Sequence, residues 1–441
     1  MKKYLILSIL CLTSLAANAA NKFYTLTGTL GQDINFRLDL EEVPYEGIIM
    51  GQTTYYRKAG NTATIKVCGQ SLRMEQEGNV FRYFLLSEFD GTKICGNFLI
   101  TFFDDGSFSD GIWTHGENTY AMNNVEILPT DNPIAFFKPV DIENASGVYR
   151  FSYDSGNEEM PEVGGSLELY HYSGNVGYSA CQVTPNIAET TGKIAEFYKN
   201  RFYFSVENAH YEVFTFEDAV FVKRTNPQAG HPESFGANAD VAGIYIPTDE
   251  QLGEEVLALF DEEKAFDQSH PFSILELNTL WMDVLQGETT YPDEIIMKDL
   301  DGDGMDEVIA RYTENKTPEY EVRNNRFVIF ALGDGGLTTV AVAQGKLEDL
   351  EIADSYVIQN ETNSRGTRTT HKYFKLQGSS VSMRATKTEA EIDNYTINGN
   401  TVKKKEFNKQ VKANNVIRVT NLNGWQEVPG NVHRNETAAR G

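Results

Sequence analysis

The residues most capable of specific chemistry lie in one short acidic run, Asp299-Leu300-Asp301-Gly302-Asp303-Gly304-Met305-Asp306-Glu307. Oxygen ligands at alternating positions around a sharp, glycine-permitted turn are the pattern of a calcium loop. Carboxylates this close repel one another unless a divalent cation lies among them, and Ca²⁺ accepts an irregular shell of hard oxygen ligands. The alternative is an acidic surface turn without a metal. We predict one Ca²⁺ site, and its expected ligands are Asp299, Asp301, Asp303, the Met305 carbonyl and Glu307.

No other part of the sequence carries a catalytic motif that stands on its own. The chain lacks a Gly-x-Ser-x-Gly nucleophile elbow, a His-Glu-x-x-His helix, a Walker phosphate loop and a Gly-x-Gly-x-x-Gly fingerprint. Its 7 histidines are scattered without ligand spacing, and no Cys-x-x-Cys pair is present to hold zinc. We therefore predict no catalytic and no organic-cofactor residues. A site assembled by the fold from dispersed carboxylates stays open as an alternative.

The N-terminus has the pattern of a secretory signal peptide at residues 1–19. Two lysines precede the apolar run from Tyr4 to Leu15, and Ala17-Asn18-Ala19 supplies a cleavage site. The apolar run is too short to span a bilayer and no other segment approaches the required length, so we expect no integral membrane segment. The mature chain should begin at Ala20 and be exported from a bacterium to the periplasm, the cell surface or the medium.

The composition narrows the classes of partner. The chain has 63 Asp+Glu against 38 Lys+Arg, a net charge of −25. A field of this sign disfavours nucleic acid and anionic lipid surfaces, and it favours solvation or cationic partners. Three cysteines remain after cleavage, Cys68, Cys95 and Cys181, too few for a disulfide scaffold. Cys68 and Cys95 could pair within one domain; the sequence leaves this pairing and the oligomeric state open.

Residues 20–128 are expected to form a first β-domain. Short alternating runs separated by turn residues are typical of an antiparallel sandwich or barrel. The landmarks along these runs are Gly51 with Tyr55 and Tyr56, Leu85 and Glu88, Gly96 with Phe98, and Gly111-Ile112-Trp113. This order resembles a β-domain of exported proteins from Bacteroides-like bacteria. The resemblance implies a fold and no stated activity.

A proline-containing linker at residues 129–140 precedes a second β-rich domain at residues 141–247. The domain ends in Phe235-Gly236-Ala237-Asn238 followed by Gly243-Ile244-Tyr245. This ending is similar to that of a domain in the same bacterial group that looks like small secreted lysozyme-inhibitor folds. The cysteine that opens the family's motif is absent here, since Glu233-Ser234 stands in its place. The resemblance implies one alternative function, inhibition of a cationic secreted enzyme such as lysozyme.

Tyrosines are frequent in both β-domains. They either form a binding face for a glycan or a protein, or fill the cores and rims of small β-structures. The tyrosines concerned are Tyr55, Tyr56, Tyr170, Tyr172, Tyr178, Tyr198 and Tyr203.

Residues 248–425 are predicted to form an α+β domain around the calcium loop. Thr248, placed to cap Gln251, and a helical apolar spacing predict a helix to about Phe266, whereas Ile274 to Leu285 fits helix or strand. The expected strands and hairpins are Glu294–Met297 with Val308–Tyr312 on either side of the loop, Phe327–Leu332 with Leu337–Ala343, and Tyr395–Ile397 with Asn400–Val402. A short helix is expected within Lys403–Lys412, and residues 426–441 are predicted to form a disordered tail.

The acidic run and the apolar strand after it resemble the calcium loops of FG-GAP and VCBS-type repeats. The resemblance implies that the carboxylates named above bind Ca²⁺. Those repeats come in series and build propellers, whereas this sequence has one such loop. Ala310, at the last position of an EF-hand loop, cannot supply the bidentate carboxylate. A single strand-loop-strand site is therefore expected to stabilise a turn.

The sequence as a whole predicts a mainly β multidomain protein, with two antiparallel β sandwich or barrel domains followed by an α+β domain with a single calcium loop. The predicted function is a non-enzymatic binding or envelope-associated role for an exported calcium-binding protein, with an unknown protein or glycan ligand. Two alternatives remain, a lysozyme-type enzyme inhibitor and a calcium-dependent hydrolase.

Overall fold

The computed structural model describes residues 20–431 except for 44–45, 57–59, 77, 131–132, 158–159, 184–185, 238, 286–289, 301, 313–325, 334, 344–349, 354–355, 364, 378–379 and 391. The expected signal peptide at residues 1–19 and the last ten residues, 432–441, lie outside this part. The fold is mainly β, as predicted. The chain divides into two compact units, the first running to Leu259 and the second starting at Phe260, with Ser173–Asn175 belonging to the second. No helix in the described ranges has the length and apolarity needed to cross a membrane.

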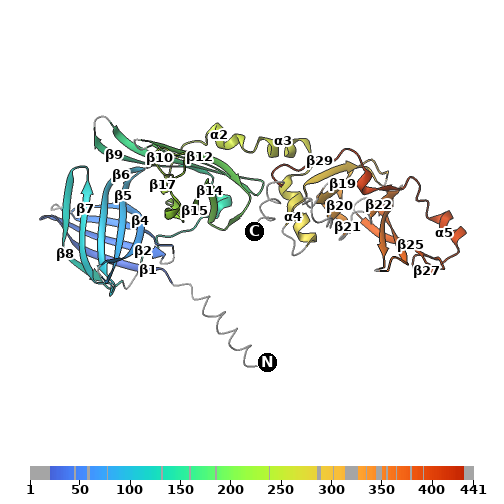
Figure 1. Cartoon of the computed structure of the whole chain (residues 1–441), viewed down its shortest axis with the longest axis horizontal. Helices are drawn as coiled ribbons and strands as arrows, with labels where there is room; N and C mark the ends of the chain where they lie inside the picture. Colours follow the sequence, from blue (N-terminus) through green and yellow to red (C-terminus); the bar gives the residue numbers. More distant parts are fainter. Residues whose placement is uncertain are drawn as a thin grey trace, which may run out of the picture. The chain divides into compact units, whose positions relative to one another are not determined.

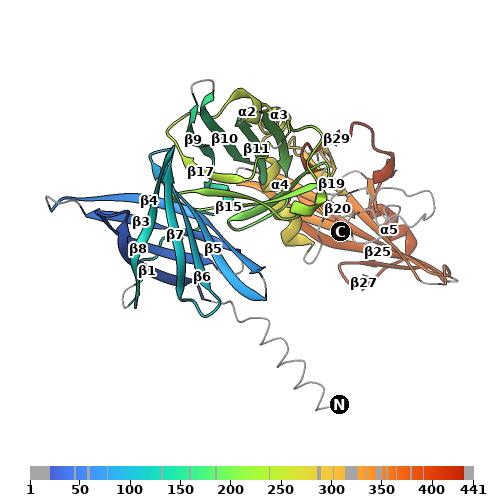
Figure 2. The same cartoon turned by 60° about the vertical axis from the view of Figure 1, so that its left-hand side comes forward.

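The first eight strands form a closed antiparallel barrel (Figures 1 and 2). Each strand pairs with the next along the chain, and β8 pairs back with β1. The strands are β1 Lys22–Leu30, β2 Ile34–Val43, β3 Ile48–Tyr56, β4 Thr62–Gln76, β5 Asn79–Asp90, β6 Lys93–Phe103, β7 Phe108–His115 and β8 Asn118–Leu128. Of the two architectures that the sequence allowed for this region, the structure has the barrel.

The barrel interior is filled mainly by alternate apolar side chains of its strands, as strand geometry requires. Its buried cluster includes Leu26, Phe36, Leu38, Val67, Phe84, Leu86, Phe98, Ile100 and Phe102. A polar network lies inside near the β2–β3 turn. Here Glu42, fully buried, pairs with Arg82 and accepts hydrogen bonds from the Tyr24 hydroxyl at 2.9 Å and from the Ser71 hydroxyl at 2.6 Å. Each of these buried polar groups therefore has a partner within the barrel.

A second group of strands completes the first unit. These strands are β9 Gly147–Asn157, β10 Met160–Tyr172, β11 Asn175–Val183, β12 Ile187–Ile194, β13 Phe197–Tyr198, β14 Arg201–Val206, β15 Ala209–Thr215, β16 Val220–Arg224 and β17 Gly243–Pro247. Antiparallel ladders join β9 to β10, β11 to β12, and β13 through β17 in order, and β17 returns to β9. The short helix α2, Glu254–Ala258, lies beside β10 and β12.

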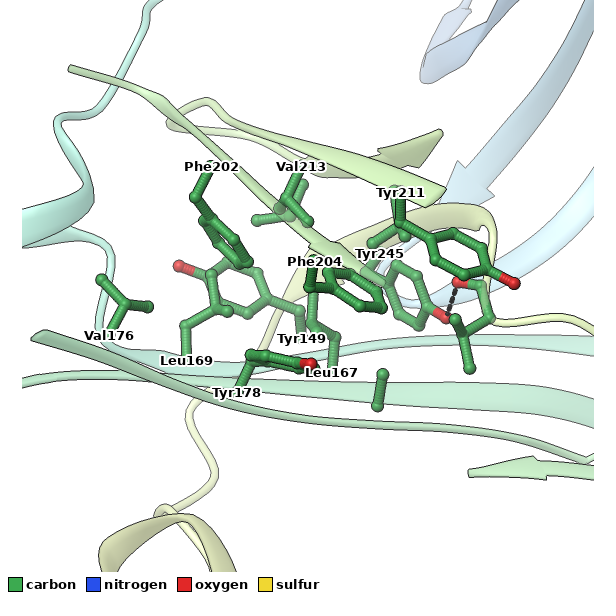
Figure 3. Packing of buried hydrophobic residues seen from close by; sticks show 14 of the residues in the cluster. Tyr149, Leu167, Leu169, Val176, Tyr178, Phe202, Phe204, Tyr211, Val213 and Tyr245 are labelled. Atoms are coloured by element: carbon green, nitrogen blue, oxygen red, sulfur yellow. Dashed lines mark hydrogen bonds between the residues drawn. The ribbon is translucent and has the colours of Figure 1, made fainter. Parts of the chain in front are cut away.

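An aromatic core holds this second group together (Figure 3). The ring of Phe204 stacks on Tyr211 at 4.8 Å between centroids and lies 4.5 Å from the ring of Tyr178. Tyr245 is fully buried, and its hydroxyl donates to the carbonyl of Val241 at 2.8 Å, closing the loop before β17. Tyr178 is therefore a core residue and not part of a binding face.

The barrel and the second strand group pack against each other in one unit. Buried apolar residues from both meet in a shared cluster: Ile48, Met50, Cys68, Phe89, Phe137, Phe214, Phe216, Ala219, Phe221 and Ile246. The expected linker also contacts the barrel, because the backbone amides of Phe136 and Phe137 donate to the carboxylate of Glu41 on β2 at 2.6 and 2.9 Å. Lys66 forms an ion pair with Asp218 at 3.0 Å. The described part of residues 129–140 is thus anchored to the barrel.

The second unit has two sheets, three α-helices and a short 3-10 helix, Val419–Asn421, in its described part. The helices are α3 Asp261–Ser269, α4 Ile274–Val284 and α5 Lys404–Gln410. One sheet has the order β21-β20-β19-β18-β29, with β18 Glu294–Lys298, β19 Glu307–Tyr312, β20 Arg326–Gly333, β21 Gly336–Ala343 and β29 Gln426–Glu427. The other has the order β27-β26-β25-β24-β23-β22-β28, with β22 Leu350–Ala353, β23 Tyr356–Thr362, β24 Thr369–Gln377, β25 Ser380–Glu389, β26 Asn394–Ile397, β27 Asn400–Thr401 and β28 Ile417–Arg418.

The five-stranded sheet is buried on both faces. Ile295 and Val308 pack on one side with Trp281 of α4. Their neighbours Ile296 and Ile309 point to the other side, into a cluster shared with the second sheet. This alternation is the physical reason why consecutive central positions of both strands, Ile295-Ile296 and Val308-Ile309, are apolar.

Two expectations for this region need correction, and the open choice between helix and strand for Ile274 to Leu285 is decided in favour of a helix. The helix expected from Thr248 to Phe266 is two helices, α2 and α3, separated by Leu259 and Phe260. The hydroxyl of Thr248 donates to the carbonyl of Val148 at 3.0 Å, and it does not cap Gln251. Ile274 begins helix α4, whose first turn is capped by Ser273.

The segment from Gln426 to Asn431, expected to begin a disordered tail, is part of the fold. Gln426 pairs with Ile295 as strand β29. Asn431 is fully buried and exchanges side-chain hydrogen bonds of 2.9 and 2.8 Å with Asn278 of α4. Burial of this amide pair fixes the end of the described chain onto the second unit.

Candidate functional sites

The acidic loop joins the adjacent antiparallel strands β18 and β19, as predicted. Lys298 is paired with Glu307 across the ladder, so the loop leaves β18 and enters β19 at the same ladder position. The structure describes four of the five expected ligands, Asp299, Asp303, Met305 and Glu307, whereas Asp301 lies outside the described residues.

Backbone amides of the loop hold the described carboxylates. The two oxygens of Asp299 accept from Gly302 N at 2.7 Å and from Gly304 N at 3.1 Å. Both glycines have a positive φ, 80° and 91°, a conformation that favours glycine. Asp303 accepts from Met305 N at 2.8 Å. The chain therefore turns sharply at the position where the calcium-loop pattern requires a glycine.

Glu307 closes the loop from inside the fold. Its side chain is buried, and its Oε2 accepts from Leu300 N at 2.7 Å. A carboxylate has about four lone-pair sites, so one amide bond per oxygen leaves capacity for a cation. Among the described residues, no group of three or more His, Cys, Asp or Glu is arranged to hold a metal. The donors are all oxygens, which suits Ca²⁺ and not zinc.

A second site lies inside the barrel, where landmarks of the first-domain sequence meet. Tyr55 of β3, Glu88 of β5 and Trp113 of β7 all point inward because they occupy alternate positions of their strands. The Tyr55 hydroxyl lies 2.8 and 2.9 Å from the two Glu88 oxygens, and the Trp113 indole N–H donates to Glu88 Oε2 at 2.8 Å. The indole lies over Gly96, where a Cβ atom would stand 2.4 Å from its nitrogen. The motif residues thus build one hydrogen-bonded group.

Burial dominates the electrostatics of this group. Glu88 is 1 % exposed. Burial raises the pKa of Glu88 above its ordinary value, and the hydrogen bonds from Trp113 and Tyr55 oppose the rise. Burial, followed by the neighbouring carboxylate, also raises the pKa of Tyr55, so its hydroxyl stays a donor to Glu88.

A cavity of about 420 Å³ opens at this end of the barrel. It is bounded by residues at the β1–β2 turn and at the ends of β3 and β4. Its aromatic and acidic lining residues are Tyr55, Tyr56, Trp113 and Asp33, and its aliphatic ones are Leu30, Ile34, Ala63 and Ile65. Eight-stranded barrels are just wide enough to be filled by side chains or to hold one small ligand. Sequence reasoning recorded Tyr55, Glu88 and Trp113 as landmarks but did not group them as a site.

The outer face of the barrel carries exposed apolar side chains on three neighbouring strands. Cross-strand pairs place Leu72 beside Tyr83, Phe81 beside Phe103, and Leu85 beside Leu99. The outer apolar face is defined by Leu72, Met74, Phe81, Tyr83, Leu85, Leu99 and Phe103, of which five are more than a third exposed. Contiguous exposed apolar groups often mark an interaction surface.

The remaining tyrosines and the cysteines form no further site in the described structure. Tyr198 and Tyr203 are exposed, while Tyr170 and Tyr172 stack on each other at 6.2 Å. The cysteine pairing that the sequence left open is not formed, because Cys68, Cys95 and Cys181 are free thiols.

Comparison with known proteins adds no assignment. No protein-family model matches the chain, and no curated protein matches it significantly in sequence. The acidic loop and the barrel mouth are therefore the features from which a function can be inferred.

Proposed function

We propose that the chain is an exported, calcium-binding protein with a non-enzymatic binding role, and that its barrel mouth holds a small molecule. The observation that carries this proposal is the cavity walled by Tyr55 and Trp113, both anchored to the buried Glu88. The three polar groups satisfy one another, so they fix the rings in place. Rings fixed before the ligand arrives lower the entropic cost of binding, which suits a binding site.

Calcium is the second part of the proposal. One Ca²⁺ is held by Asp299, Asp301, Asp303, the Met305 carbonyl and Glu307, and it stabilises the turn between β18 and β19. The support is the spacing of the carboxylates, the positive φ of the glycine at the turn and the position of the loop within a paired hairpin. Export is supported by the signal-peptide pattern of residues 1–19.

Uptake of a neutral apolar fluorophore tests the binding role. N-phenyl-1-naphthylamine should bind the mature protein saturably with enhanced fluorescence. Ala63→Trp, which fills the cavity, and Trp113→Leu, which removes a wall, should each abolish the saturable phase. Tyr198→Leu, an exposed tyrosine outside the barrel, is the matched control and should bind as the wild type does. Saturable binding that survives both barrel substitutions, in variants with unchanged circular dichroism, would disprove a ligand site at the mouth.

The outer apolar face favours envelope association as a second candidate function. Its residues would be covered by an apolar surface of a protein in the cell envelope, because the acidic chain disfavours anionic lipid. The double variant Met74→Ser/Phe103→Ser should leave the envelope fraction in which the wild type is retained. If both proteins distribute alike, this role is wrong and the barrel mouth remains the candidate site.

A further inference from the structure

We infer that the second unit carries a binding surface of its own, and that the occupant of this surface is an anionic polysaccharide. We call the surface the lysine–amide face; it comprises residues 394–416, which form the hairpin β26–β27, helix α5 and the segment before β28. It belongs to the second unit, whereas the barrel mouth belongs to the first. The inference therefore goes beyond the binding role proposed above.

Charge is distributed unevenly along the chain. Residues 350–418, which hold the seven-stranded sheet and α5, contain 12 Lys+Arg and 7 Asp+Glu, a net charge of +5 within a chain of net charge −25. This count includes Asp354 and Glu391, which lie outside the described residues, so the excess does not depend on their placement. Charges more than about 8–10 Å away are largely screened at physiological salt, so a ligand at this surface responds to the local positive charge.

Five lysines of this excess gather on the lysine–amide face. All five are exposed, and the described part of the chain provides none of them with an ion pair or a side-chain hydrogen bond: Lys403, Lys404, Lys405, Lys409 and Lys412. The acidic residue within the face, Glu406, accepts a hydrogen bond from Gln410 at 3.3 Å. Residues 394–416 therefore present five cations and one carboxylate.

Helix α5 holds these charges on the outer side of the sheet. Phe407 is buried beneath the helix, and its ring lies 5.2 Å from that of Tyr395 between centroids. Lys405 and Lys409 are four residues apart, so they extend from one face of the helix and repel each other. Lys403 occupies the N-cap position without a capping hydrogen bond. These features weaken a short helix, and a polyanion lying across the lysines would remove their repulsion.

The other side chains of the face favour a sugar chain over other polyanions. Seven exposed amides surround the lysines: Asn394, Asn398, Asn400, Asn408, Gln410, Asn414 and Asn415. An amide offers both donors and an acceptor, which match sugar hydroxyl groups, while lysines match carboxylate, sulfate or phosphate groups. The two aromatic residues of the face, Tyr395 and Phe407, are buried. A nucleic acid therefore finds no ring to stack on, and a bilayer finds the apolar side of α5 already packed on the sheet.

A matched pair of polymers tests the inference on the mature full-length protein. Polygalacturonate and its fully methyl-esterified form share one backbone and differ in charge. Calorimetric titration at about 50 mM salt should show binding of polygalacturonate and none of the ester, and added salt should weaken the binding. EDTA is present throughout, because calcium could otherwise bridge the carboxylates of the polymer and of the protein.

A lysine variant locates the surface. Lys405→Gln/Lys409→Gln/Lys412→Gln should weaken polygalacturonate binding about tenfold or more, because each exposed pair of charges contributes severalfold to affinity. A control variant removes the same amount of charge from three exposed lysines of the first unit and should bind within about twofold of the wild type. This control is Lys22→Gln/Lys93→Gln/Lys199→Gln.

An amide variant tests the sugar. Asn408→Ala/Asn414→Ala keeps the charge and should weaken binding about threefold, an effect that attraction between charges alone does not produce. Wild-type affinity in this variant overturns the inference, and so does tighter binding, per unit charge, of oligothymidylate or of phosphatidylglycerol vesicles.

The remaining outcomes separate the inference from the proposed function. Equal binding of the two polymers, no binding of polygalacturonate, or wild-type affinity in the lysine variant with unchanged circular dichroism overturns the inference. Uptake of N-phenyl-1-naphthylamine at the barrel mouth should be the same in the wild type and in all three variants. The proposed binding role therefore stands or falls by that uptake alone.

Discussion

Replacement of Glu88 should loosen the barrel in a way that depends on the replacing side chain. In Glu88→Ala the indole N–H of Trp113 and the hydroxyl of Tyr55 lose their acceptor inside the barrel. A buried donor left without a partner costs about 1–3 kcal/mol, so two such donors predict a loss of about 2–6 kcal/mol. Glu88→Gln behaves differently, because Oε2 alone lies within hydrogen-bond distance of both donors, at 2.8 and 2.9 Å. An amide oxygen at that place keeps both bonds, and we expect a change of about 1 kcal/mol or less.

Hydrogen exchange read by mass spectrometry measures this loss in the barrel alone, within the full chain. Peptides from β3, β5 and β7 should exchange at least about thirtyfold faster in Glu88→Ala, while peptides from the second unit keep their rates. Glu126→Ala, at an exposed position of β8, is the matched control and should exchange as the wild type does. Barrel exchange in Glu88→Ala within threefold of wild type would show that the hydrogen-bonded group does not hold the mouth together. Equal losses in the Ala and Gln variants would show that charge, and not the acceptor, matters.

Three further predictions concern other parts of the chain. Millimolar Ca²⁺ should raise the unfolding temperature of the second unit relative to EDTA, with about 2.7 kcal/mol of stabilisation at a hundredfold excess over a dissociation constant of about 0.1–1 mM. Asp301→Ala should abolish this calorimetric response, whereas Asp306→Ala, an exposed neighbour outside the expected ligand set, should keep it. Identical scans with Ca²⁺ and with EDTA would refute the site. In urea unfolding, Leu86→Ala should lower the free energy of unfolding by about 2–5 kcal/mol, because Leu86 is 2 % exposed and lies inside the barrel. Leu85→Ala should lower it by about 1 kcal/mol or less, because Leu85 is 37 % exposed and lies outside. Equal losses would contradict the strand register. Thiol titration at pH 8 without reductant should find Cys68 unreactive in the native protein, because burial raises its pKa to about 12. After denaturation the same titration should find three thiols, whereas a single thiol would indicate a disulfide.

Local sequence signals predicted those parts of the fold whose partners are close in the chain. The Asn398-Gly399 turn has positive φ at both residues, 49° and 79°, as the hairpin prediction requires. The apolar pattern of Ile274 to Leu285 fits helix or strand, but Ser273 and Glu276 have capping-box spacing, and the Ser273 side chain accepts the amide of Glu276 at 3.1 Å. The spacing was sufficient evidence for a helix there.

Contacts between distant segments were beyond such reasoning. Glu41 anchors the expected linker through an amide 95 residues away, and Asn278 holds Asn431 from 153 residues away. Composition marked the linker and the C-terminal segment as loosely structured because proline, glycine and polar residues are frequent in both. Their partners are single polar side chains in other elements, and no periodicity in a sequence predicts such pairs.

The two candidate sites also differ in how far apart their residues lie in the sequence, and this difference decides which experiment each site needs. The calcium ligands lie within one hairpin loop, so their spacing alone specifies their mutual geometry, and metal removal is a sufficient test. Tyr55, Glu88 and Trp113 come from three strands, and only closure of the barrel brings them together. A one-residue register shift in any one of these strands turns its residue outward and breaks the group. The barrel site therefore has to be tested together with the fold, which is why the fluorophore titration above is paired with variants that keep the barrel and change its mouth.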